Sequence, residues 1–228
     1  KSHNGYGVAA WGDAGVICPW TMYQAYGDEH ILRKHYRSMA RWISFCRKNS
    51  RGLLRPAEGY GDWLSINANT PKDVLATAYF AHSADLVAQT AAVLGRTGDT
   101  EKYCRLHEQI KDAFNQAYVL GNGRIKGDTQ TVYVLALRFN LLPEALRAPA
   151  ARHLVEDIES RGWHLSTGFV GTKDLMTVLT DTGHLDVAYR LFHNKSFPSW
   201  GFSIQHGATS IWERWDGWTP EKGFQTPG

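Results

Sequence analysis

The sequence has little cysteine and no recognisable metal motif. Its 228 residues hold three cysteines, Cys18, Cys46 and Cys104, and their spacing matches neither a zinc site nor a disulfide framework. No histidine has a partner at the spacing of a helical metal site. We therefore expect no metal, and nothing in the composition calls for a cofactor.

Strong charge and long apolar runs are also missing. The 25 Lys and Arg against 22 Asp and Glu leave a net charge of +3 without a polybasic run, so nucleic acid and anionic membranes are poor candidate partners. No window approaches the roughly 18 apolar residues of a membrane span. The opening KSHNGYGVAA does not have the layout of a signal peptide. These absences slightly favour a cytoplasmic location.

Aromatic residues are abundant. Nine Trp, ten Tyr and nine Phe make up 12% of the chain. One face of a pyranose presents C–H groups that pack on a flat ring, while its hydroxyls turn toward polar side chains. Core packing accounts for part of this excess, and the remainder indicates a sugar-binding site.

Apolar residues recur at helical spacing, and strand signals are weak, so we expect an all-α fold. Only 201–211 has a pattern compatible with an extended segment. The periodicity predicts four pairs of helices, at 14–26 with 29–48, 72–94 with 99–118, 129–139 with 144–160, and 173–180 with 184–193.

Turns within these pairs are short, whereas the loops between pairs are longer and rich in Gly, Asp and Trp. This alternation predicts helical hairpins arranged in a ring, with the inner helices' N-terminal loops converging on one end. We expect a partial or complete α/α toroid.

The stretch TSIWERWDGW, residues 209–218, sets Glu213 and Asp216 among three tryptophans with Arg214 between them. A carboxylate beside indole rings loses hydration, so its pKa rises unless hydrogen-bond donors compensate. Such a group can exchange protons near neutral pH. The alternative is a packing corner in which Glu213 forms a structural ion pair with Arg214 or another base.

Six motifs in order resemble the (α/α)6 catalytic domain of the bacterial-type α-L-rhamnosidases, glycoside hydrolase family 78. They are AWGDAGVICPWTMYQAYGD, GYGDWLS, TPKDVLATAYFAHSADL, GDTQTVYVLAL, HLSTGFVGT and GATSIWERWDGW. The resemblance covers nearly the whole chain. Because the family has six hairpins and this chain about four with a closing segment, the resemblance implies an incomplete (α/α)6 toroid, in which residues 1–228 are part of a single catalytic domain. It implies an inverting glycosidase that removes terminal α-L-rhamnose from glycosides or oligosaccharides.

By this resemblance Glu213 is the general base, which activates a water molecule. Trp11 and Trp63 match rings that border the rhamnose subsite, and Trp212 is a candidate for the same wall. Asp13 and Asp62, beside the first two rings, become candidate acceptors for sugar hydroxyls.

The sequence departs from the family at two motifs. The general acid of the family lies in a segment reading roughly Arg-Asp-Glu-Arg-Leu-Gly-Trp, and a sugar-binding histidine lies in an Asn-His-Tyr segment; neither run occurs between Lys1 and Gly228. We therefore expect an internal piece of a longer enzyme, completed by segments at both ends and inactive alone.

Two other function classes stay open. One is a non-catalytic helical toroid that binds glycans, and the other is an α/α-toroid hydrolase or lyase acting on another sugar, such as a uronide. A uronide site would need Arg and Lys on the inner loops. Those loops hold aromatic, acidic and hydroxyl residues with Arg214 as the sole base, which fits a neutral deoxy sugar better.

Overall fold

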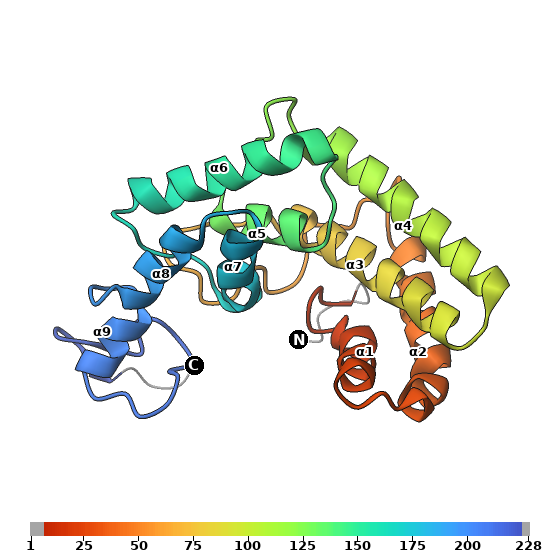
Figure 1. Ribbon diagram of the computed structural model, residues 1–228, viewed down its shortest axis with the longest axis horizontal. Coiled ribbons are helices and arrows are strands. Elements are labelled where there is room, and N and C mark those ends of the chain that lie inside the picture. The colour runs from red at the N-terminus through yellow and green to blue at the C-terminus, as the bar shows by residue number, and fades with distance from the viewer. Residues whose placement is uncertain (1–6, 225–228) are drawn as a thin grey trace. The chain divides into compact units, whose positions relative to one another are not determined.

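The computed structural model describes residues 7–224, which are mainly helical (Figure 1). A short antiparallel pair of strands, β1 (Trp218–Thr219) and β2 (Gly223–Phe224), follows the last helix. The helices are, in chain order, α1 (Ala14–Tyr26), α2 (Glu29–Lys48), α3 (Lys72–Val93), α4 (Thr97–Tyr118), α5 (Gln130–Arg138), α6 (Glu144–Ser160), α7 (Phe169–Asp181), α8 (Leu185–His193) and α9 (Trp200–Gln205).

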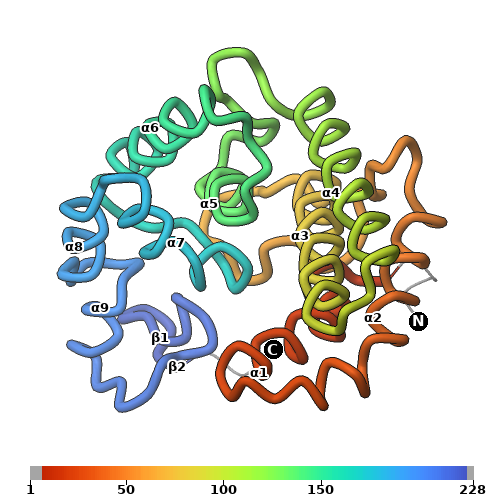
Figure 2. The backbone as a smooth tube through the Cα atoms, turned by 45° about the vertical axis from the view of Figure 1, so that its right-hand side comes forward, coloured from red at the N-terminus to blue at the C-terminus, as the bar shows by residue number. Residues whose placement is uncertain are grey.

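The described chain divides into two compact units. Residues 7–61, 71–120 and 139–142 form the first unit, and residues 62–70, 121–138 and 143–224 form the second. The first contains the hairpins α1–α2 and α3–α4, and the second contains α5–α6 and α7–α8 with α9 and the strands. Figure 2 follows the chain through these hairpins. The four predicted helix pairs are thus present.

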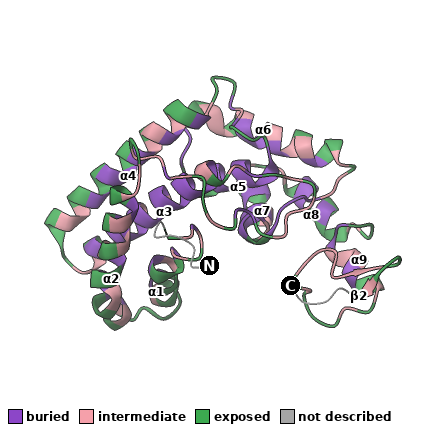
Figure 3. Ribbon diagram, turned by 180° about the vertical axis from the view of Figure 1, so that it is seen from behind, coloured by how far each residue is buried: buried purple, intermediate pink, exposed green. Residues whose placement is uncertain are grey.

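In the first unit, α3 is buried along most of its length and α4 covers it with one apolar face (Figure 3). Ile110 and Phe114 on that face are fully buried. The row on α2 that includes Leu32, Met39 and Ile43 is also buried, as its helical spacing predicts. Helix α1 is the exception, because its apolar sequence leaves several side chains exposed.

In the second unit the buried helix is α5. Every residue from Gln130 to Leu137 is buried, and α6 and α7 pack against this helix. Helix α6 contributes Leu154 and Ile158, and α7 contributes Leu175 and Leu179. Each unit therefore has a nearly all-apolar helix covered by amphipathic ones.

The predicted helix bounds hold closely for 14–26, 29–48 and 144–160. Two predictions differ from the structure. Helix α7 begins at Phe169 instead of Lys173, and the stretch expected to run extended starts inside helix α9, so that prediction was wrong. Ser199 caps α9, because its hydroxyl oxygen accepts a hydrogen bond from the backbone N–H of Phe202 at 3.0 Å.

Within residues 7–224, no helix combines the length and apolar character needed to cross a bilayer. The same residues contain no cluster of three or more His, Cys, Asp and Glu side chains that could hold a metal ion. Cys46 is buried, Cys18 and Cys104 are exposed, and all three thiols are free.

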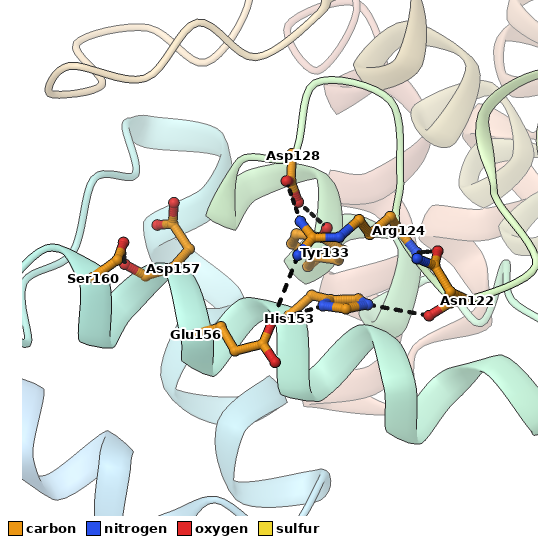
Figure 4. A network of polar contacts seen from close by, with 8 residues as sticks. All are labelled: Asn122, Arg124, Asp128, Tyr133, His153, Glu156, Asp157 and Ser160. Carbon is orange, nitrogen blue, oxygen red and sulfur yellow. Dashed lines mark hydrogen bonds and ion pairs between the residues drawn. The ribbon is translucent and has the colours of Figure 1, made fainter.

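A polar network fastens the loop before α5 to α6 (Figure 4). The buried Tyr133 donates its hydroxyl hydrogen bond to Asp128, which also pairs with Arg124. Glu156 of α6 lies 3.8 Å from Arg124 and 2.8 Å from the Nδ1 atom of His153. Burial, followed by the bond to Asp128, raises the pKa of Tyr133 above its ordinary value. Tyr133 therefore holds the loop as a neutral donor.

We predict that Tyr133→Phe lowers the free energy of unfolding by about 0.5–1.5 kcal/mol, the net contribution of one hydrogen bond, because the ring keeps its packing and only the donor is lost. Urea unfolding followed by circular dichroism measures this change. The control is Tyr26→Phe, at a tyrosine that is 74% exposed and should be neutral. Equal unfolding midpoints for the two variants would contradict the role given to the hydroxyl.

Candidate active site

In the first unit, Asp13 of the Trp11-Gly12-Asp13 loop is buried and holds that loop in place. Asp13 is 2% exposed. Its Oδ1 accepts hydrogen bonds from Trp42 Nε1 at 2.7 Å and Ser83 Oγ at 2.6 Å, and its Oδ2 accepts one from the backbone N–H of Ala10 at 2.9 Å. The carboxylate therefore ties the loop before α1 to α2 and α3. Burial raises the pKa of Asp13, and these hydrogen bonds oppose the rise.

The neighbouring Trp11 is 39% exposed. Its ring meets the ring of Tyr60 edge to face, with centroids 4.9 Å apart. Between Trp11 and Asp13, Gly12 lies so close to Trp42 that a Cβ atom would fall 2.3 Å from that ring. The loop thus buries its acid and leaves its indole accessible.

In the second unit, Asp62 is 6% exposed and binds the N-terminus of α7. Its Oδ1 accepts from the backbone N–H groups of Val170 at 2.9 Å and Gly171 at 3.2 Å. Its Oδ2 accepts from the Gly168 N–H at 2.8 Å and from the Thr131 hydroxyl. The first N–H groups of a helix have no partner within the helix, so Asp62 caps α7 from a distant part of the chain.

This cap also places Trp63. The carbonyl oxygen of Trp63 accepts the Phe169 N–H at 2.9 Å, and the indole is 44% exposed. A Cβ atom on Gly168 would lie 2.1 Å from that carbonyl oxygen and 2.7 Å from the Asp62 carbonyl oxygen. Only glycine fits where the two loops meet.

Both aspartates were predicted from sequence to accept hydrogen bonds from sugar hydroxyls. A carboxylate has about four acceptor positions, and protein donors take four at Asp62 and three at Asp13. Burial also raises the pKa of Asp62 against the opposing effect of its donors. These contacts favour a role in holding the loops over direct sugar binding.

A cavity of about 530 Å³ opens beside this junction, within the second unit. Leu64 lines it together with Gly168, Phe169, Thr172 and Lys173 at the start of α7. Helix α9 contributes Trp200, Ser203 and Ile204, and residues 208–215 complete the wall. Trp212 and Glu213 therefore lie in the lining, next to the loops that Asp62 joins.

Indole contacts hold the segment around Glu213 in place. Trp215 donates its Nε1 hydrogen bond to the Thr167 carbonyl oxygen at 2.8 Å, and its ring meets Trp200 edge to face with centroids 5.3 Å apart. Trp212 packs against Phe224 with centroids 5.9 Å apart. Residues 212–215 are thus fixed against both the loop before α7 and the β2 strand.

The structure corrects two expectations about Glu213. Arg214 does not form the structural ion pair with it, because its guanidinium binds Asp216 through two hydrogen bonds of 2.6 and 3.0 Å. This pairing lowers the pKa of Asp216. Glu213 is also exposed instead of enclosed by indoles. Its carboxylate is therefore open to water and to a bound molecule.

The second unit brings together Asp62, Trp63, Trp212 and Glu213 around one cavity and its adjoining loop, whereas Trp11 and Asp13 belong to the first unit. Sequence reasoning did not single out Gly168, Phe169 or Thr131. A usable signal was present, because HLSTGFVGT and GDTQTVYVLAL contain these residues. The sequence did not show that Asp62 forms hydrogen bonds with these motifs.

We predict that Gly168→Ala destabilises the protein and displaces the Trp63 loop, because the added methyl group overlaps backbone atoms that cannot rotate away. Overpacking of this kind typically costs about 1–3 kcal/mol. Thermal unfolding and Trp fluorescence measure the two effects. Gly121→Ala is the matched control, since a Cβ atom there meets nothing within 4 Å. A Gly168→Ala protein as stable as this control would show that the junction is not tightly packed.

Comparison with known proteins identifies relatives along the whole chain. Residues 2–226 match the family described as the bacterial alpha-L-rhamnosidase six-hairpin glycosidase domain. An alpha-L-rhamnosidase of Streptomyces avermitilis is 58% identical over 223 residues, covering 98% of this chain and 22% of that protein. One from Formosa agariphila is 39% identical over 231 residues, covering 97% of this chain and 25% of the relative.

Solved structures agree with this result. The S. avermitilis alpha-L-rhamnosidase complexed with L-rhamnose matches with a TM-score of 0.93 at 57% identity, over 96% of this chain and 21% of that one. The Aspergillus terreus enzyme matches with a TM-score of 0.91 at 29% identity, over 100% of this chain and 28% of that one. The chain spans about a quarter or less of the curated relatives named above. The predicted all-α fold, a partial α/α toroid, is confirmed, and the chain belongs to the bacterial α-L-rhamnosidase six-hairpin glycosidase family.

Proposed function

We propose that the full-length protein is a glycoside hydrolase that removes terminal α-L-rhamnose from glycosides or oligosaccharides. The observation that carries this proposal is the exposed Glu213 on the wall of an indole-rich cavity, in a chain of this family. A carboxylate that is free of ion pairing can act on a water molecule held in such a cavity. Relatives named alpha-L-rhamnosidase support the choice of sugar.

The proposed mechanism is inverting. Glu213 takes a proton from a water molecule, whose oxygen attacks the anomeric carbon on the face opposite the leaving group. A general acid, contributed by residues outside this chain, donates a proton to the leaving oxygen. Inverting enzymes hold their two carboxyl groups roughly 6.5–9.5 Å apart to leave room for the water. The Arg214 guanidinium binds Asp216 directly and does not take up the Glu213 carboxylate in an ion pair.

Aromatic rings bind the sugar in this proposal. Rhamnose carries a 5-methyl group and an apolar ring face, which pack favourably on indole. Trp11, Trp63 and Trp212 are the proposed ring partners. Asp13 and Asp62 were predicted to accept hydrogen bonds from sugar hydroxyls. We propose that they act mainly by holding the loops that carry Trp11 and Trp63. Residues 1–228 form part of one catalytic domain, which other segments of the enzyme complete.

The decisive variant is Glu213→Gln in the full-length protein. Glutamine keeps the shape of the side chain but cannot accept a proton from water, so kcat should fall by roughly 10²–10⁴-fold while KM and Tm barely change. Initial rates on an aryl α-L-rhamnoside measure this. Glu221→Gln, at an exposed acid nearby in sequence, is the control. A near-normal kcat for Glu213→Gln at the pH optimum of the enzyme would remove Glu213 from the mechanism.

The face on which Glu213 acts can be tested with the smaller variant Glu213→Ala. Azide can enter the space left by the carboxylate and attack from the face of the general base. The expected product from an α-L-rhamnoside is the β-rhamnosyl azide, identified by NMR. Formation of the α-azide would show attack from the face of the leaving group and would contradict the role of Glu213 as general base.

The 228-residue chain by itself should hydrolyse aryl rhamnosides no faster than background. General acid and general base assistance are each worth typically about 10²–10⁴-fold, and the proposed acid is not among these residues. The measurement compares the purified chain with buffer and with the full-length enzyme. Robust turnover by the chain alone would show that the general acid lies within it.

A further inference from the structure

A second cavity, of about 470 Å³, lies in the second unit where α6 ends and α8 ends. Its lining includes Trp163, Arg190, His193, Lys195 and Ser196, and it shares no residue with the cavity beside Glu213. The lining holds two cationic side chains and a histidine, and it contains no acid. The first cavity also has two cations in its lining, Lys173 and Arg214, but it contains the acid Glu213 as well.

The cationic group at the centre of this cavity is held in a fixed orientation. The Arg190 guanidinium lies over the Trp163 ring, 3.5 Å from its centroid. The backbone of Trp163 is held in turn by two hydrogen bonds. Its carbonyl oxygen accepts one from Asn194 Nδ2 at 2.8 Å, and its backbone N–H donates one to the Ile158 carbonyl oxygen at 2.9 Å. The N–H bonds of a guanidinium lie in its own plane. When the guanidinium stacks on an indole, this plane is parallel to the ring, so the donors point sideways to other groups and not into the ring.

The cations of this cavity also lack acidic partners. Within residues 7–224, neither Arg190 nor Lys195 forms an ion pair, although Asp186 stands one turn before Arg190 on α8. Six other arginines of the described chain pair with acids, whereas several exposed ones, such as Arg37 and Arg41, resemble Arg190 in forming no ion pair. The guanidinium of Arg190 contacts an indole instead, which leaves its charge available to an external anion.

Hydroxyl groups accompany the charges. The Ser196 hydroxyl lies 2.8 Å from His164 Nε2 and donates a hydrogen bond to Asn194 Oδ1 at 2.8 Å. Its position is therefore set before any ligand arrives. The guanidinium can bind a carboxylate or a sulfate ester through two parallel hydrogen bonds. The Ser196 oxygen, whose proton is donated to Asn194, can still accept a hydrogen bond from a sugar hydroxyl.

We propose that this cavity is an accessory site for an anionic sugar unit, a uronate or a sugar sulfate ester, of a polysaccharide chain. The proposal does not depend on the role given to Glu213. A nucleic acid fits less well, because its binding requires many phosphate contacts and this cavity offers two permanent cations. The site would hold an acidic stretch of the polymer apart from the cavity that receives the neutral sugar.

The test is affinity gel electrophoresis of the full-length protein in gels that contain oligogalacturonate, dextran sulfate or neutral dextran. The two charged polymers distinguish carboxylate from sulfate recognition. We expect retardation by at least one of them, none by neutral dextran, and weaker binding as the salt concentration rises. The double variant Arg190→Gln/Lys195→Gln should raise the Kd at least about tenfold, as expected for lost charge-assisted hydrogen bonds.

The matched control is Lys34→Gln/Arg37→Gln, which removes the same charge from two exposed positions on α2 and should leave binding unchanged. If the double variant at the cavity does not fold, the exposed Lys195→Gln alone should still weaken binding. Hydrolysis of an aryl rhamnoside should stay normal in the cavity variants, and Glu213→Gln should still bind the charged polymer, so the two proposals fail independently.

Three results would overturn the accessory site. The first is binding to both charged polymers no stronger than to neutral dextran. The second is an equal loss of binding in the α2 control, which would assign the effect to net charge. The third is equally tight binding of inorganic polyphosphate with the same dependence on Arg190 and Lys195, which would show an anion site without preference for sugars.

Discussion

The buried carboxylate of Asp62 is the interaction on which the candidate site depends. It accepts three backbone N–H groups at the start of α7 and the Thr131 hydroxyl of α5. Each of these N–H groups would otherwise be buried without a partner, at a cost of about 1–3 kcal/mol. The same contacts press Gly168 against the carbonyl oxygen of Trp63. One side chain thus fixes the start of a helix, a wall of the cavity and an accessible indole.

In each unit, a buried aspartate holds a loop against neighbouring helices. Asp13 joins its loop to α2 and α3 through Trp42 and Ser83. In both loops the aspartate is buried, while a tryptophan beside it in the sequence is exposed. A flat ring on a loop binds a sugar well only when the loop is rigid, because ordering a mobile loop opposes binding. The buried acids provide that rigidity. Glu213 differs from both, since it is exposed.

The sequence predicted most of the helices because their apolar faces repeat at helical spacing, as on α2 and α6. It failed where a distant partner decides the local structure. The start of α7 depends on Asp62, which lies more than a hundred residues earlier. The acids show the same limit. Resemblance selected Asp13, Asp62 and Glu213, but their neighbours in sequence could not show which are buried, or that Arg214 binds Asp216 and leaves Glu213 unpaired.

The location of Arg190 and Lys195 in a different cavity from Glu213 has a chemical reason in the proposed mechanism. Glycoside hydrolysis passes through a state with positive charge on the sugar ring, which a nearby carboxylate stabilises and a nearby cation opposes. At the first cavity the charge of Arg214 is taken up by Asp216, and Lys173 lies exposed at the rim. The unpaired Arg190 and Lys195 belong to another cavity. If Glu213 acts as proposed, cations that hold anionic sugar units would oppose catalysis beside it, so the two proposals are compatible only because Arg190 and Lys195 line a different cavity.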